Sequence, residues 1–203
     1  MIPSRGYFAT VILIMVAGCA GTAGDVIVDI PAHKPPQGTS ALSGVPPAAI
    51  DIGDFRRSVE TGVLPGRIGE RKTIANISLG MVTVQPTPAR LVRDAFKAEL
   101  EAAGHRSAKS AASILIDGEV KRFDLRTDVT ALYWDVIFSA DVSVRIRNGA
   151  VEGNGDYSAV CTERTYAWPG GDLIARLVAK CIGDLSGKFR NDRNIARTLA
   201  GSS

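Results

Sequence analysis

The stretch 133-YWDVIFSADVSVRIRNGAVEGNGDYSAVCTER-164 carries the strongest structural pattern in this chain of 203 residues. Apolar and polar side chains alternate up to residue 147, which is typical of an antiparallel strand with one face on a core and one in water. Asn148-Gly149 is the preferred two-residue hairpin turn, so residues 151–164 are expected to return beside that strand. With a further strand expected over residues 113–125, the pattern predicts a three-stranded meander.

Two amphipathic segments are predicted to form helices on this sheet. The first covers residues 88–104, with Pro88 in its first turn and Gly104 at its C-terminal end. The second begins at Asp172, a natural N-cap residue. Both segments repeat apolar residues every three or four positions, so each presents one apolar face. These residues are Leu91, Val92, Ala95, Phe96 and Leu100 in the first helix, and Leu173, Ile174, Leu177, Val178, Cys181, Ile182, Leu185 and Phe189 in the second.

Weaker patterns occupy the rest of the folded part. Strands are expected over residues 48–55 and within 74–84, a long loop over 56–70, an edge strand over 26–30 and a short helix after Arg190. Together these elements predict the α+β class, with an antiparallel β-sheet of about four or five strands and two main helices packed on one face.

The N-terminus reads as an export signal. Arg5 is followed by an uncharged apolar run and then by small residues, the order of a secretory signal. The apolar run is shorter than the roughly 20 residues of a membrane span. Val16-Ala17-Gly18-Cys19 resembles the lipobox of bacterial lipoproteins, and this resemblance implies cleavage before Cys19 and attachment of lipid to it. Ala20 stands where Asp would favour the inner membrane in enteric-type lipoproteins, so the outer membrane is expected.

These features divide the chain into three parts. Residues 1–18 form the signal peptide, residues 19–47 a Pro/Gly-rich linker after lipidated Cys19, and residues 48–203 a single globular domain. The composition, with 45% hydrophobic and 22% charged residues, is ordinary for a globular protein. The net charge of +3 is small and the basic residues are interleaved with acids, which argues against a nucleic-acid partner.

The remaining cysteines are Cys161 and Cys181, and an exported chain matures where thiols are oxidised. A disulfide between them and a pair of buried free thiols are both open alternatives. With only two histidines, His33 and His105, and no Cys/His cluster, no metal site and no cofactor are expected.

We expect no enzymatic activity. The serines near His105 lack the motif of a nucleophile, and Asp117 and Glu119 lie two apart on a strand, so they share its solvent-facing side. No catalytic residue is therefore assigned.

Two groups of residues are candidates for binding a partner. Arg56, Arg57, Arg67 and Arg71 lie in or beside the predicted loop and suit an anionic partner such as a lipid headgroup or a glycan, the alternative being a solvated loop. Tyr166 and Trp168, together with Tyr133-Trp134, form the second group. Aromatic side chains are enriched at interfaces, and the alternative places Trp134 in the core with the others capping its edge.

The order of these elements resembles the YajG family of bacterial lipoproteins. The matching segments are residues 16–19, the strand 50–55 with its Asp54-Phe55-Arg56 step, the helix end 100–105, the strand 114–120, Tyr157 and the helix segment 182–185. The family has no established biochemical activity, so the resemblance implies location and fold more than mechanism. The cysteine pair is a departure from the family pattern.

The expected function is that of a non-catalytic lipoprotein, lipid-anchored on the periplasmic face of the bacterial outer membrane, which binds an envelope protein or a glycan. Three alternatives remain open. An accessory lipoprotein of an envelope transport system would have an exposed apolar groove. An activator of cell-wall synthesis would work through a protruding loop and tail. An enzyme acting on wall material would have a deep cleft with an acid pair of raised pKa.

Overall fold

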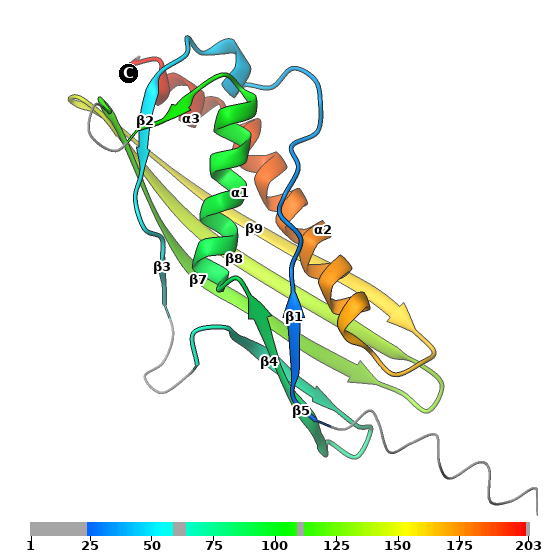
Figure 1. The fold of residues 1–203 in the computed structure, drawn as a ribbon. Helices are drawn as coiled ribbons and strands as arrows, with labels where there is room; N and C mark the ends of the chain where they lie inside the picture. The colour runs from blue at the N-terminus through cyan, green and yellow to red at the C-terminus, as the bar shows by residue number, and fades with distance from the viewer. Residues whose placement is uncertain (1–23, 59–63, 109–111, 202–203) are drawn as a thin grey trace, which may run out of the picture.

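The computed structural model describes residues 24–58, 64–108 and 112–201. In these ranges the chain forms one mixed sheet of nine strands and three α-helices (Figure 1). The elements are β1 (Val26–Asp29), the 3-10 helix η1 (Leu42–Gly44), β2 (Ala49–Ile52), β3 (Arg56–Arg57), β4 (Arg67–Lys72), β5 (Ser78–Gln85), α1 (Pro88–Ala102), β6 (Arg106–Ser107), β7 (Ile114–Val129), β8 (Trp134–Asn148), β9 (Val151–Thr165), α2 (Gly171–Arg190) and α3 (Arg193–Leu199).

The predicted meander is confirmed as the centre of the sheet. β7 pairs antiparallel with β8, and β8 pairs antiparallel with β9 around the turn at Asn148-Gly149. Alternate residues of β8 are buried under the helices, as the sequence pattern predicts: Val136, Phe138, Ala140, Val142, Val144 and Ile146 are each at most 2% exposed.

The sheet is larger than four or five strands, and it is not purely antiparallel. Three short strands follow one another along the outer edge of β7, namely β2, β3 and β4, and all three run parallel to it. β5 then pairs antiparallel with β4, β1 pairs parallel with β5, and β6 pairs parallel with β2. β7 has 16 residues, so its edge is long enough for three short partners in turn. The predicted loop over 56–70 therefore contains β3 and the start of β4.

Helices α1 and α2 lie side by side on one face of the meander (Figure 1). The Phe96 ring of α1 stacks on the Phe189 ring of α2 with centroids 4.4 Å apart, and the rings of Phe55 and Tyr157 meet this pair edge-on. Gly170, not Asp172, is the N-cap of α2, and Asp172 lies in its first turn. There its negative charge still interacts favourably with the helix dipole and stabilises the N-terminal end of α2.

The segment 24–47 packs on the domain. β1 pairs with β5 over four residues, so the expected edge strand is present. Leu42 is fully buried, and Val28, Ile30 and Val45 are each at most 7% exposed. The described part of the predicted linker is thus held against the sheet and helices, because it contributes apolar side chains to the same core.

Candidate functional site

The predicted aromatic residues meet at one end of the meander. The rings of Trp134 and Trp168 lie 4.9 Å apart, and those of Tyr133 and Tyr166 lie 6.4 Å apart. They come from the start of β8 and from the loop between β9 and α2, which are neighbours because β8 and β9 are paired there. Trp134 is half-buried, so the expectation that it belongs to the core is wrong, and Tyr166 is 79% exposed.

One ion pair braces this aromatic cluster. The Arg164 guanidinium donates two hydrogen bonds of 2.8 Å to the Asp135 carboxylate across β8 and β9. It also lies 3.7 Å from the centroid of the Tyr133 ring, a cation–π contact. Its hydrogen bonds lower the pKa of Asp135 and raise the pKa of Arg164. Both groups therefore stay charged at neutral pH.

The four candidate arginines do not form one anion-binding loop. The Arg57 guanidinium donates to the backbone carbonyls of Pro65, Arg67 and Phe123, and burial lowers its pKa. Arg71 is 2% exposed and donates to the carbonyls of Gly24, Leu79 and Pro169. These two cations hold backbone segments together, so they are not available to a partner.

Arg56 and Arg67 occupy separate strands, β3 and β4. Arg56 is exposed and Arg67 is half-buried. Of the four arginines predicted to bind an anionic partner, these are the two whose guanidinium groups do not hold backbone segments together within the described part of the chain. They do not form one cluster with Arg57 and Arg71.

A buried carboxylate, Glu99, lies near the C-terminal end of α1. It is 1% exposed, and one carboxylate oxygen lies 2.7 Å from Nε2 of His33. The other oxygen lies 3.9 Å from Nε of Arg190 and has no hydrogen-bond partner among the described residues. Glu99 thus brings together α1, the segment around His33 and the C-terminal end of α2, at the wall of a pocket of about 300 Å³.

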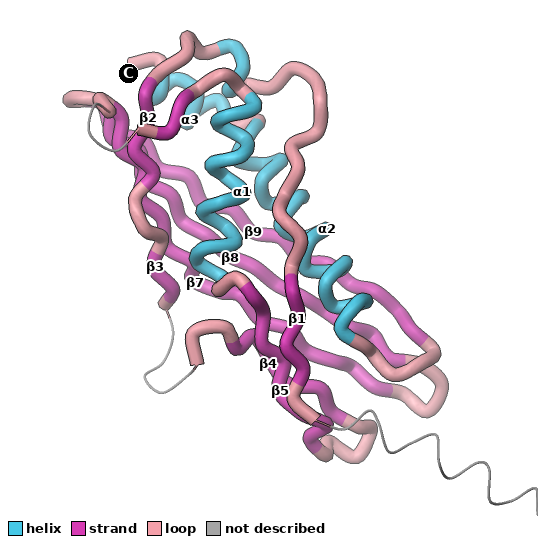
Figure 2. Tube along the Cα trace, in the orientation of Figure 1, coloured by secondary structure: helices cyan, strands magenta, loops and turns pink. Residues whose placement is uncertain are grey.

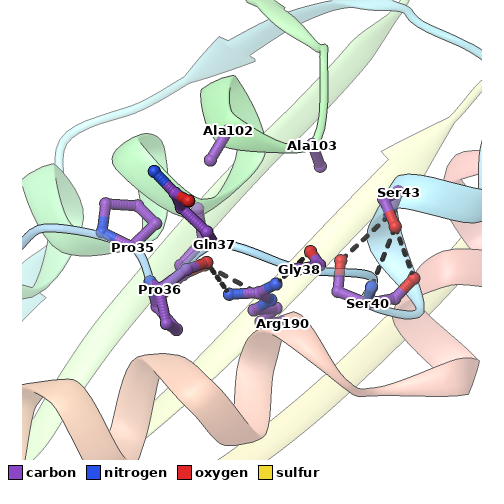
Figure 3. Close-up of a pocket in the computed structure, with 10 residues that line it drawn as sticks. Pro35, Pro36, Gln37, Gly38, Ser40, Ser43, Ala102, Ala103 and Arg190 are labelled. Atoms are coloured by element: carbon purple, nitrogen blue, oxygen red, sulfur yellow. Dashed lines mark hydrogen bonds and ion pairs between the residues drawn. The ribbon is translucent and has the colours of Figure 1, made fainter.

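Figure 3 shows how the rest of this pocket is built. Arg190 reaches from α2 and donates to the carbonyls of Pro36 and Gly38. The hydroxyls of Ser40 and Ser43 each accept from the other's backbone amide. The pocket's polar groups thus largely serve to hold the segment 33–43 against α1 and α2. We call these contacts, of His33 with Glu99 and of Arg190 with Pro36 and Gly38, the clasp.

His105 is buried, with 3% of its surface exposed. Its Nδ1 accepts from the amide of Ala48 at 3.2 Å, and burial lowers its pKa, opposed by a backbone hydrogen bond with Leu42. The neutral ring is the form that this contact requires. No group of three or more His, Cys, Asp or Glu side chains with the arrangement of a metal site occurs within the ranges that the structure describes.

The two cysteines are joined by a disulfide between β9 and α2. Cys161 and Cys181 are 5% and 0% exposed, and their Cα atoms lie 5.7 Å apart. The bond fixes α2 to the last strand of the meander, beside the outer edge of the sheet.

A shallow groove of about 570 Å³ runs along this outer edge, between β9 and α2. In the described residues β9 pairs with β8 alone, so its other edge faces the groove. Small residues of α2, Gly183 and Gly187, leave room there, and Val160 of β9 is 66% exposed. Asp184, Lys188 and Asn191 form the polar part of its lining.

Sequence reasoning missed both the clasp and the groove. Glu99 was visible as a charged residue at the margin of an apolar helical stripe, a pattern that signals a buried and paired carboxylate. The groove had a weaker signal, the spacing of Gly183 and Gly187 on one face of a helix.

Cys19 and the predicted signal peptide, residues 1–18, lie outside the described residues. Within the described ranges, none of the helices has a stretch long and apolar enough to cross a bilayer.

No protein-family model matches the chain, and no curated protein sequence matches it. Among solved structures, a Xanthomonas campestris protein assigned to the DUF330 family superposes with a TM-score of 0.56 at 8% identity, over 86% of this chain and 95% of that one. An uncharacterized protein superposes with a TM-score of 0.51 at 11% identity, over 83% and 97%. A minor lipoprotein from Acinetobacter baumannii superposes less well, with a TM-score of 0.38 at 13% identity, over 68% of this chain and 95% of that one. The chain is therefore similar to the first two proteins in its fold, and in its fold alone.

Proposed function

We propose that this chain is a non-catalytic lipoprotein, anchored by lipid at Cys19 to the periplasmic face of the bacterial outer membrane, and that its domain binds another envelope component. The lipobox-like sequence at residues 16–19 supports the anchor, and Ala20 in place of Asp favours the outer membrane. Gly24, where the described fold begins, follows Cys19 by only five residues. The lipid would hold the domain close to the membrane surface.

The open edge of β9 carries the proposal of a binding role. This strand has 15 residues, and the backbone groups of its outer edge can add a strand from a partner, which would displace Lys188 from the Ser158 carbonyl that it now donates to. The adjacent groove accepts side chains over Gly183 and Gly187, and the exposed Val160 offers an apolar contact. An envelope protein with an extended segment fits this edge better than a glycan, because backbone pairing is the main contact on offer.

The chemistry of the acidic residues supports a non-catalytic role. The pKa of Asp135 is lowered by Arg164, and that of Asp156 by hydrogen bonds from Ser143 and Lys121. A general acid needs a pKa shifted in the opposite direction. Glu99 is buried, but its neighbours hold backbone segments in place.

The test of the binding role is photo-crosslinking in intact envelopes. A photoreactive amino acid in place of Val160 should capture one discrete protein, and the same amino acid in place of Leu115, an exposed residue elsewhere on the meander, should not. With the photoreactive amino acid kept at position 160, Thr162→Lys at an exposed position of the same strand should abolish the capture, because a charge on an edge strand opposes pairing. Equal capture from positions 160 and 115, or capture that survives Thr162→Lys, would refute a partner at this edge.

The anchor has its own test. Cys19→Ala should leave an unprocessed or soluble product, whereas the wild-type chain should fractionate with the outer membrane. A Cys19→Ala chain that is still cleaved and membrane-bound would defeat the proposal.

A second candidate function is an accessory lipoprotein of an envelope transport system, acting on lipid or another substrate between the two membranes. The small apolar residues that line the β9–α2 groove favour it. In that case Val160 should crosslink to a lipid and not to a protein. Another alternative, activation of cell-wall synthesis, depends on a protruding loop and tail, and the central residues 59–63 of the predicted loop lie outside the described ranges.

A further inference from the structure

Four large apolar side chains are exposed on the turns at one end of the sheet. They are Ile74 and Ile77 in the β4–β5 turn, Leu132 in the β7–β8 loop and Tyr166 in the β9–α2 loop, at 65%, 63%, 79% and 79% exposure. We call these four residues the apolar tip. They are half of the eight exposed large hydrophobic residues in the described ranges, so exposed apolar surface is concentrated at this end.

The three turns are held together by contacts between the strands. Figure 2 shows the turn 73–77 and the loops 130–133 and 166–170 at the same lower end of the molecule. Arg71, close to the first turn, donates to the carbonyl of Pro169 in the third. Pro169 follows Trp168, whose ring contacts Trp134 beside the second. The three turns of the apolar tip therefore form one end of the fold. Arg71 and the aromatic cluster lie between the tip and the rest of the sheet and hold the turns in place.

The described chain also enters the fold at this end. The amide of Gly24 donates to the carbonyl of Leu79 at 2.9 Å, and the carbonyl of Gly24 accepts from Arg71. Leu79 lies two residues after Ile77. Five residues of extended chain reach at most about 18 Å, so Gly24 stays within that distance of Cys19, and the apolar tip lies at the same end of the fold as Gly24. Helix α2 begins near this end and is about 30 Å long, so its C-terminal end lies toward the opposite end of the molecule (Figure 1).

We propose that the apolar tip rests on the phospholipid bilayer and sets the orientation of the domain on the membrane. This proposal depends on the proposed lipid anchor at Cys19, because the anchor is what places a bilayer within reach of Gly24. The partner that the apolar tip contacts is the lipid surface itself. The β9–α2 groove, lined by residues from the later half of α2, then points away from the membrane toward other envelope components.

The side chains of the tip suit the zone between lipid headgroups and acyl chains. Tyrosine and tryptophan prefer this interface because their rings are apolar and their polar atoms can remain hydrated. Leucine and isoleucine on the outermost turns can enter the acyl region. The cations beside the tip are paired, Arg164 with Asp135 and Arg126 with Asp128, so attraction to anionic lipid is not the main force.

The solvent-facing side of the meander is a poor alternative for this contact. It carries ion pairs such as Lys121 with Asp156 and Arg147 with Asp117. Burying these groups against lipid would remove their hydration, which is unfavourable. Among the surfaces near Gly24, the tip is the one that gains from contact with a bilayer.

The native fluorescence of the protein tests this proposal directly. The chain has two tryptophans, Trp134 and Trp168, and both lie in the aromatic cluster below the tip. The mature lipidated protein should be reconstituted into vesicles of phosphatidylethanolamine and phosphatidylglycerol whose acyl chains carry bromine, a short-range quencher. We expect quenching of the tryptophan emission relative to vesicles without bromine.

Ile77→Asp combined with Leu132→Asp should remove most of this quenching, and Leu115→Asp, at the other end of β7, should leave it unchanged. All of these side chains are exposed, so the variants should fold, and an unchanged thermal midpoint checks this. Vesicle flotation separates the two proposals. A wild-type chain that does not float contradicts the anchor, whereas one that floats without quenching overturns the contact of the tip with lipid. A photoreactive amino acid at Leu132 that captures a protein in intact envelopes, in place of lipid, also overturns it.

Discussion

Reduction of the disulfide between Cys161 and Cys181 should lower the free energy of unfolding by about 3 kcal/mol. The bond closes a loop with a sequence separation of 20 residues. In the chain-entropy account, a crosslink over a loop of that size removes about 11 cal/mol/K of entropy from the unfolded chain, which is about 3 kcal/mol at 25 °C. Both cysteines are buried in a formed core, so the folded state is expected to change little when the bond opens.

Urea unfolding with and without a phosphine reductant measures this difference on one and the same chain. For a slope of about 2 kcal/mol/M, the midpoint should fall by roughly 1.5 M. The thermal midpoint should fall by roughly 6–12 °C for a domain of this size. Thiol labelling after denaturation establishes that the bond has opened.

The matched control is the double variant Cys161→Ala and Cys181→Ala. It should unfold near the midpoint of the reduced wild type, lowered further by the small cavities that the substitutions leave, and it should not respond to the reductant. A reductant-induced shift of less than about 1 kcal/mol in the wild type would refute the reasoning, because the loop would then have been constrained without the bond.

Three further perturbations test other parts of the fold. Phe96→Ala should cost about 3–5 kcal/mol in urea unfolding, since its ring is 1% exposed and stacks on Phe189; a cost below about 1 kcal/mol would mean that this stack is not central to the core. Gly118→Ala should cost about 1–3 kcal/mol, because the added methyl would overlap the Phe55 ring. In contrast, Gly183→Ala should stabilise α2 by about 0.5–1 kcal/mol, since nothing lies within 4 Å of the new methyl; the reverse order of these two glycine variants would contradict the packing described. Burial lowers the pKa of His105 in the folded state, so the unfolded chain takes up a proton first as the pH falls through the ordinary histidine value of about 6.5. The wild type should therefore lose stability relative to His105→Gln as the pH falls from about 6.5 to about 5, with no loss above the unfolded pKa, and parallel curves for the two proteins would show that His105 does not titrate as proposed.

The meander and the helices could be predicted because their signals are local. The alternation of β8, the Asn148-Gly149 turn and the apolar stripe of α1 each lie within a few consecutive residues, and tertiary packing reinforces them. The sequence also pointed to Tyr166 and Trp168, which the fold brings together with Tyr133 and Trp134 because their segments adjoin paired strands.

The parallel strands could not be predicted in the same way. β3 has two residues, both arginine, and β4 contains Arg67, Glu70, Arg71 and Lys72, so neither shows apolar alternation. Their place in the sheet is set by the free edge of β7, which lies far along the chain. This placement explains why Arg71 is buried. Because β4 lies inside the sheet, the Arg71 guanidinium donates to three backbone carbonyls and is not exposed to solvent.

The pairing of β1 with β5 has a mechanical consequence for a tethered domain. The two strands run parallel with a continuous register from Val26 and Val82 to Asp29 and Gln85. A pull on the chain before Gly24 acts along the axis of β1, so the hydrogen bonds of the pair resist in shear and share the load. If they rupture, the force passes to the clasp, where His33 meets Glu99 and Arg190 holds Pro36 and Gly38. The N-terminal segment would therefore yield in two steps under tension, with the sheet and helices behind it still folded.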